Sequence, residues 1–144
     1  MLKPALFALI IAALTACSPP GPKFDVHDGW ARETGQSDIA AAYVTIDNKG
    51  GADELTGVRA TIGTAMLHES SMDGGIMRMR PIDPSQGGLV VPSNGSLRLA
   101  PNGAHVMIMG LKEPLKAGDH FDMTLLFDKA GPRKVTVTVK PAAN

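Results

Sequence analysis

The sequence predicts an all-β domain, a Greek-key sandwich or barrel, and three observations support this fold class. Short runs rich in Val, Ile and Thr recur between turn signals, 16 Gly and 11 Pro separate them, and no long segment has helical periodicity. The 144 residues are enough for one domain with a real core. We therefore expect short strands joined in a sandwich or barrel topology.

The expected strands follow from apolar and β-branched runs that end at Gly, Pro, Asn or Asp. In order, they are 24–31, 41–47, 54–61, 65–70, 76–81, 88–91, 96–100, 105–110, 119–127 and 133–140. The fourth and fifth form a hairpin around Met72-Asp73-Gly74-Gly75, because turn residues between two runs favour this motif. In the last strand, Val135, Val137 and Val139 alternate with polar residues, which predicts one buried and one wet face.

The N-terminus predicts export. Residues 1–16 combine Lys3 with a short apolar run, 5–14, too short to span a membrane. The run ends in Leu14-Thr15-Ala16-Cys17, which resembles a bacterial lipobox, so residues 1–16 are interpreted as a lipoprotein signal peptide and Cys17 as the lipidation site. The alternative is an ordinary signal peptide with a chance Cys.

A lipid anchor at Cys17 sets the expected domain organisation. Residues 17–23 form a flexible tether, 24–140 the folded domain and 141–144 a short tail. Several acyl chains anchor a protein firmly, so we expect it to be lipid-anchored to a membrane on the periplasmic or extracytoplasmic side. Ser18 after the Cys resembles a signal for the outer membrane, if the cell is Gram-negative.

Composition excludes several functions. Lys and Arg number 14, and so do Asp and Glu; no basic patch calls for nucleic acid. The single Cys excludes an intrachain disulfide, a Cys-based zinc site and an iron–sulfur cluster within this chain. No carboxylate pair, Ser/His/Asp order or phosphate loop stands in a convincing context, so we do not expect an enzyme.

Methionine and histidine gather in one stretch, 65–111. It holds six of the eight Met and two of the four His. Thioether and imidazole ligands without a thiolate suit a soft monovalent ion, with Cu(I) as the leading candidate. Outside the cytosol, thioethers have the further advantage that they cannot form disulfides.

Strand periodicity brings some of these donors together. His105 and Met107 project from one face of their strand, Met109 lies further along the same face, and Val106 and Ile108 point to the core. The 65–81 hairpin can bring His68 near Met79. Four ligands, two imidazoles and two thioethers, can then converge. Their neutrality favours Cu(I) over Cu(II).

For most of the other Met and His residues we expect structural roles. We expect Met66 and Met123 to fill core, and His27 and His120 to be surface or hydrogen-bonded residues. Met72, predicted at a turn, and Met77 stay open as auxiliary ligands with Met109. Met77 shares strand parity with Met79, so periodicity does not choose between them.

The run from His68 to Met79 and the segment from His105 through Met107 to Gly110 closely resemble the PCu(A)C family of periplasmic copper chaperones, the DUF461 type. The resemblance extends over the exported domain, including Trp30, Tyr43 and Asn48. It implies a cupredoxin-like fold and an exposed Cu(I) site formed by His, a Met after ten intervening residues, and His-x-Met.

Applied to this sequence, the family pattern selects His68, Met79, His105 and Met107, because ten residues separate His68 from Met79. The interval between Met79 and His105 is longer than the family's, which fits a loop insertion around 84–88. The tail, 141–144, lacks the His/Met-rich extension with which some members hold Cu(II).

The resemblance implies a metallochaperone that passes Cu(I) to the dinuclear copper centre of cytochrome c oxidase. Its partners would be the copper-bearing oxidase subunit, a Sco-type thioredoxin-like protein, or both. Two alternatives stay open: a copper-sequestering or resistance lipoprotein, and a structural β-domain without metal. A blue-copper electron carrier is rejected, because its His₂Cys ligand set needs a Cys other than Cys17.

Overall fold

Ten strands and one short 3₁₀ helix follow one another in residues 18–142, the part of the chain that the computed structural model describes. They are β1 (Phe24–Arg32), β2 (Ile39–Asn48), β3 (Asp53–Ala60), β4 (Thr64–Asp73), β5 (Ile76–Pro81), η1 (Pro84–Gln86), β6 (Leu89–Val91), β7 (Ser96–Leu99), β8 (Ala104–Met109), β9 (His120–Phe127) and β10 (Gly131–Lys140). The predicted all-β class and the order of the strands are confirmed.

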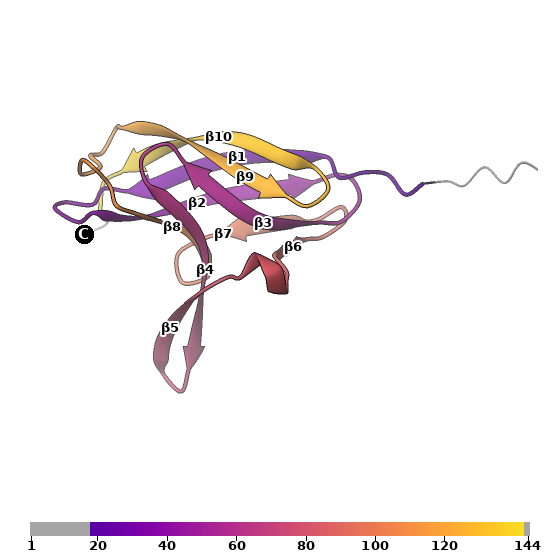
Figure 1. Cartoon of the computed structure of the whole chain (residues 1–144), viewed down its shortest axis with the longest axis horizontal. Helices are drawn as coiled ribbons and strands as arrows, with labels where there is room; N and C mark the ends of the chain where they lie inside the picture. The colour runs from indigo at the N-terminus through magenta and orange to yellow at the C-terminus, as the bar shows by residue number, and fades with distance from the viewer. Residues whose placement is uncertain (1–17, 143–144) are drawn as a thin grey trace, which may run out of the picture.

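The strands form one rolled sheet in the order β5-β4-β8-β2-β1-β10-β9-β3-β6, with β7 paired to β2 (Figure 1). The β1–β10 pair is parallel and the others are antiparallel. Because β3 also packs against β4, the sheet curls round toward closure. The β4–β5 hairpin projects from the side of this barrel (Figure 1).

The core fills the inside of the rolled sheet with alternate residues of each strand. Val135, Val137 and Val139 are buried while Lys140 is exposed, as the alternation predicted. Burying an aliphatic side chain of this size contributes about 1.5–3 kcal/mol. The largest fully buried side chains are Ile46, Leu55, Leu99, Ile108, Met123 and Leu125.

The β4–β5 hairpin is longer than the sequence predicted. Strand β4 runs to Asp73 rather than to Ser70, and only Gly74 and Gly75 form the turn. Both have positive φ, 57° and 83°, which glycine adopts without a Cβ clash. The prediction that Met72 lies at a turn is therefore wrong, since Met72 is a strand residue paired with Met77.

Asn48 ties the start of the domain to two loops. Its Oδ1 accepts from the backbone N–H of Lys23 and of Gly50, at 3.1 and 2.9 Å. Its Nδ2 donates to the carbonyls of Gly51 and Pro92, at 2.8 and 3.1 Å. Four hydrogen bonds satisfy this buried amide completely, so its role is structural.

The residues before β1 are bound to the same loop. The N–H of Gly51 donates to the carbonyls of Pro20 and Gly21, and the N–H of Lys49 donates to that of Lys23, at 2.9 Å. A Cβ at Gly50 would stand 2.1 Å from the Gly21 oxygen, so this approach requires glycine. The later part of the expected flexible tether is therefore hydrogen-bonded to the domain, whereas residues 1–17, including Cys17, lie outside the described residues.

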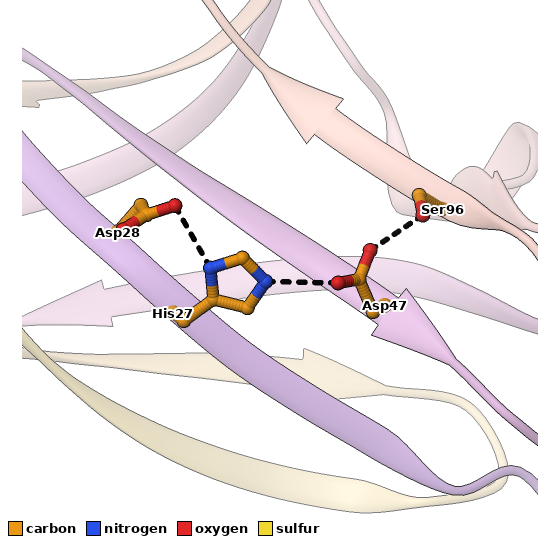
Figure 2. A network of polar contacts seen from close by, with 4 residues as sticks. All are labelled: His27, Asp28, Asp47 and Ser96. Atoms are coloured by element: carbon orange, nitrogen blue, oxygen red, sulfur yellow. Dashed lines mark hydrogen bonds and ion pairs between the residues drawn. The ribbon is translucent and has the colours of Figure 1, made fainter.

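A polar network joins β1, β2 and β7 on the outside of the barrel (Figure 2). The His27 ring bonds Asp28 through Nδ1 and Asp47 through Nε2, both at 2.9 Å, and Ser96 donates to the second oxygen of Asp47. The bond to Asp47, then that to Asp28, raises the pKa of His27. The bonds from Ser96 and then His27 lower the pKa of Asp47. The prediction that His27 is a hydrogen-bonded surface residue is confirmed.

These shifts predict a pH-dependent stability. Because the pKa of His27 is raised in the folded state, His27 contributes to stability. This contribution is fully present below pH 6.5, the ordinary pKa of histidine, and is lost as pH rises through the folded-state pKa. Because the pKa of Asp47 is lowered in the folded state, its contribution to stability is present above pH 3.8 and is lost as pH falls through the folded-state pKa. Urea unfolding should therefore show that His27→Gln destabilises most between pH 3.8 and 6.5.

His120→Gln is the matched control, because His120 is an exposed imidazole with one bond to the Thr138 hydroxyl. Its effect on unfolding should not follow this profile. A constant loss for His27→Gln across the whole pH range would contradict the electrostatic account.

Candidate metal centre

The candidate centre is built on two neighbouring strands, β4 and β8. His68 and His105 are direct partners in this antiparallel pair, so their side chains point to the same side of the sheet. Their ring centroids are 5.9 Å apart, with 19° between the planes. The flanking Leu67 and Val106 point into the core, which places both imidazoles on the outer face.

Both imidazoles are nearly buried although they lie on the outer face. His68 is 9% exposed and His105 6%. The Nδ1 of His105 lies 3.0 Å from the carbonyl of Gly103, an acceptor only, so Nδ1 carries the proton and Nε2 keeps the lone pair. A backbone carbonyl that fixes the tautomer in this way is the usual support of a metal-binding histidine.

His68 has the opposite situation. Its Nδ1 is buried and has no hydrogen-bond partner, the one such side-chain atom among residues 18–142. Burial, then the neighbouring His105, lowers the pKa of His68 and outweighs the opposing effect of a contact with the Met66 backbone, so the ring favours its neutral form. That contact does not have the geometry of a hydrogen bond to Nδ1. A buried polar atom left without a partner costs about 1–3 kcal/mol, and an ion bound at this nitrogen would relieve the cost.

Tyr43 extends the candidate centre onto β2. Its ring centroid lies 6.5 Å from that of His105 and 4.4 Å from that of Trp30. Burial raises the pKa of Tyr43, so its phenol stays neutral. Aromatic packing thus supports His105 from the side opposite His68, a role that the motif spacing alone did not reveal.

The thioethers approach from two sides. Met107 lies two residues after His105 on β8, and Met79 lies on β5, opposite Ser70. A groove of about 520 Å³ beside the hairpin is lined by Met77, Met79, His105 and Met107, among others. The structure therefore brings two predicted thioethers to the same groove as His105, with His68 beside it.

Among the auxiliary candidates, Met77 alone lines this groove. Met72 lies nearer the hairpin tip, and Met109 lies at the end of β8, between Thr64 and Ile39. Strand register puts Met77 and Met79 on one face of the hairpin. The structure, like the strand periodicity, therefore does not choose between them as the thioether nearest the two imidazoles.

The prediction for Met66 is wrong. Met66 is 38% exposed rather than a core residue, and it stands directly opposite Met107 on the outer face. Met66 lies two residues before His68 in the same strand, so both side chains face the same side of the sheet. This spacing was the sequence signal for its position. Met123 is fully buried, as predicted, and His120 is an exposed residue bonded to Thr138.

The donor set limits the ion. Within residues 18–142, no group of three His, Cys, Asp or Glu side chains could hold a metal. Two imidazoles and neighbouring thioethers are neutral, mixed-softness ligands, a set that suits Cu(I) better than Mg²⁺, Ca²⁺ or Mn²⁺. The same described residues include no helix long and apolar enough to cross a membrane.

Comparisons with known proteins identify the family of the chain. A family model described as "Putative lipoprotein LpqE-like" matches residues 24–139. A protein of Leifsonia xyli named "Putative lipoprotein Lxx21020" is 31% identical over 153 residues, covering 97% of this chain and 90% of that protein.

Two solved structures are similar. The apo PCuAC domain from PmoF1 has a TM-score of 0.67 and 26% identity, covering 85% of this chain and 97% of that one. The solution structure of CuI-DR1885 from Deinococcus radiodurans has a TM-score of 0.54 and 34% identity, covering 80% and 78%. The cupredoxin-like fold is confirmed.

The unpartnered Nδ1 predicts that the centre lowers the stability of the metal-free protein. His68→Leu removes the buried polar atom and puts an apolar side chain of similar size in its place. It should therefore raise the free energy of unfolding by about 1 kcal/mol. Urea denaturation without metal would measure this. His105→Leu is the control, because it removes the bond to Gly103 and should not stabilise. A loss of stability in His68→Leu would contradict the account.

Proposed function

The chain belongs to the LpqE-like family, which is of the PCuAC type, and on this premise we propose that it is an extracytoplasmic copper chaperone that carries Cu(I). The solved relatives are PCuAC domains and a CuI-form protein rather than enzymes. The protein is accordingly not an enzyme, and the copper ion is its cargo.

The proposed ligands are His68, His105, Met79 and Met107. The observation that carries the proposal is the cross-strand pair of nearly buried imidazoles, 5.9 Å apart, with an unpartnered nitrogen on His68. Four neutral ligands leave a bound ion with its own single charge. Thioethers beside imidazoles favour Cu(I), while Cu(II) is better served by nitrogen and oxygen donors.

The unequal exposure of these ligands fits a carrier that must release its ion. The imidazoles are shielded, whereas Met79 is 58% exposed on the projecting hairpin. Met79 is therefore the ligand that an incoming donor group would replace first. An acceptor built with Cys offers thiolates, which are softer and stronger donors than thioethers, so copper would move toward it one ligand at a time.

We place the protein outside the cytoplasmic membrane, held by a lipid on Cys17. Support comes from the lipoprotein descriptions of the family and of the Leifsonia xyli relative, together with the lipobox-like sequence. Outer-membrane attachment, if the cell is Gram-negative, rests on Ser18. Formal charge is balanced, in keeping with a role that does not involve nucleic acid.

A Cu(I) titration tests the ligand set. The full chain, without oxygen and in competition with a chromophoric chelator, should bind one equivalent tightly. His68→Ala, Met79→Leu, His105→Ala and Met107→Leu should each weaken binding by at least about 10–100-fold, the loss seen even for outer-shell partners of metal ligands.

Met123→Leu serves as the matched control, because Met123 is fully buried in the core away from the outer face. It should leave the copper affinity unchanged. Equal affinity in the wild type and all four ligand variants would return these residues to a structural role, as expected for a β-domain without metal.

The proposed acceptor is the dinuclear copper centre of cytochrome c oxidase, reached directly or through a Sco-type thioredoxin-like protein. Deletion of the gene should lower the copper content of the oxidase at limiting copper, and added copper should restore it. A His105→Ala gene should fail to complement. A copper-sensitive strain with fully metallated oxidase would instead identify a sequestering lipoprotein.

A further inference from the structure

Three methionine side chains lie on the projecting hairpin, outside the core. Met72, Met77 and Met79 are 65%, 45% and 58% exposed. Methionine normally fills irregular gaps in a core, and a cluster of exposed apolar side chains marks a binding function. The β4–β5 hairpin extends away from the barrel (Figure 1), and the exposure of these three side chains shows that they do not fill the core.

Strand register places the three thioethers on one face of the hairpin. Met72 pairs with Met77 and Ser70 with Met79, two positions apart, so these side chains share a face with His68. Partners directly across an antiparallel pair have Cβ atoms about 4.5–5.5 Å apart, and diagonal neighbours lie about 7–8 Å apart. Three flexible thioethers can therefore reach one ion.

The opposite face of the hairpin carries charge. Arg78 contacts Asp73 at 3.4 Å, and Arg80 donates to Glu69 at 3.0 Å. Opposite charges thus pair on this face and leave no net charge to attract a charged partner. The two faces have different chemistry, and soft donors are confined to the one that continues into the candidate centre.

We propose that Met72, Met77 and Met79 form a second, weaker Cu(I) site at the hairpin tip, through which copper enters the inner centre. The proposal rests on the proposed copper function and deepens it. A set of thioethers alone selects a soft monovalent ion and discriminates against Zn²⁺ and other divalent ions. This site would take Cu(I) from a donor before the buried imidazoles are reached.

Transfer from the tip needs only ligand exchange. Met79 belongs to both sites, so the ion keeps the Met79 thioether while Met72 and Met77 are replaced by His68, His105 and Met107. Cu(I) remains monovalent throughout, because all the ligands are neutral and no electron or proton is exchanged.

The test is a Cu(I) titration of the full chain, labelled with ¹³C at the methionine methyl groups, under anaerobic conditions. The first equivalent should shift the methyl signals of Met79 and Met107. A second equivalent should shift those of Met72 and Met77, and it should bind more weakly because Met79 is already a ligand of the inner centre. Zn²⁺ should shift neither tip signal. Met72→Leu/Met77→Leu should keep the first equivalent, lose the second and load several-fold more slowly from a Cu(I) chelate.

Ile76 provides a matched control on the other hairpin face. It is 62% exposed and pairs with Asp73 on the charged side. Adding Ile76→Met to the double Leu variant restores a thioether near the tip on the wrong face, so it should restore neither the second equivalent nor the loading rate. Both exposed substitutions keep apolar side chains of similar size, so folding is preserved.

The outcomes separate this proposal from the proposed function. Unshifted Met72 and Met77 signals, or normal loading in the double Leu variant, would overturn the tip site while the inner centre still binds copper. Normal loading combined with failure to pass copper to an acceptor would make the patch a docking surface and also overturn it. A first equivalent that is indifferent to His68→Ala/His105→Ala would overturn the proposed function instead.

Discussion

The pairing of β4 on both of its edges determines the geometry of the candidate metal centre. Strand β8 places His105 directly opposite His68. Strand β5 places Met79 opposite Ser70, which is two residues after His68 and on the same face. Side chains alternate between faces, so a slip of one residue in the hairpin would turn its thioethers toward the charged side. The two-residue turn at Gly74–Gly75 prevents such a slip, and it does so because both residues accept positive φ.

Solvent exposure changes along this single face. The imidazoles are almost fully shielded, whereas the three thioethers of the hairpin are 45–65% exposed. At the shielded end, the His105 tautomer is fixed by the Gly103 carbonyl, and one nitrogen of His68 has no hydrogen-bond partner. The metal-free fold therefore retains an unfavourable contact where an ion would bind, which is how a binding site departs from the most stable packing.

Local sequence patterns were sufficient to predict most of the strands and the faces of several side chains. Alternation predicted that Val106 and Ile108 are core and that His105 and Met107 share a face, and turn residues located the strands. The direct His68–His105 partnership was not predictable in the same way, because it depends on a contact between strands separated in the sequence by β5, η1, β6 and β7. Met66 was misassigned for a related reason: its parity with His68 puts both residues on one face, but the pairing with β8 decides that this face is the outer one.

The N-terminal segment adds a constraint on how the centre can meet a partner. Residues 20–23 are bound at the Asn48 end of β2, whereas Met107 pairs with Ala41 near the other end. Seven residues of strand separate these positions, roughly 23 Å at about 3.3 Å per residue. Figure 1 shows the N-terminal segment leaving one end of the barrel while the hairpin projects from its side. A lipid anchor that precedes this segment would thus hold the barrel by the end remote from the proposed copper ligands, and the hairpin would stay open to a donor or an acceptor.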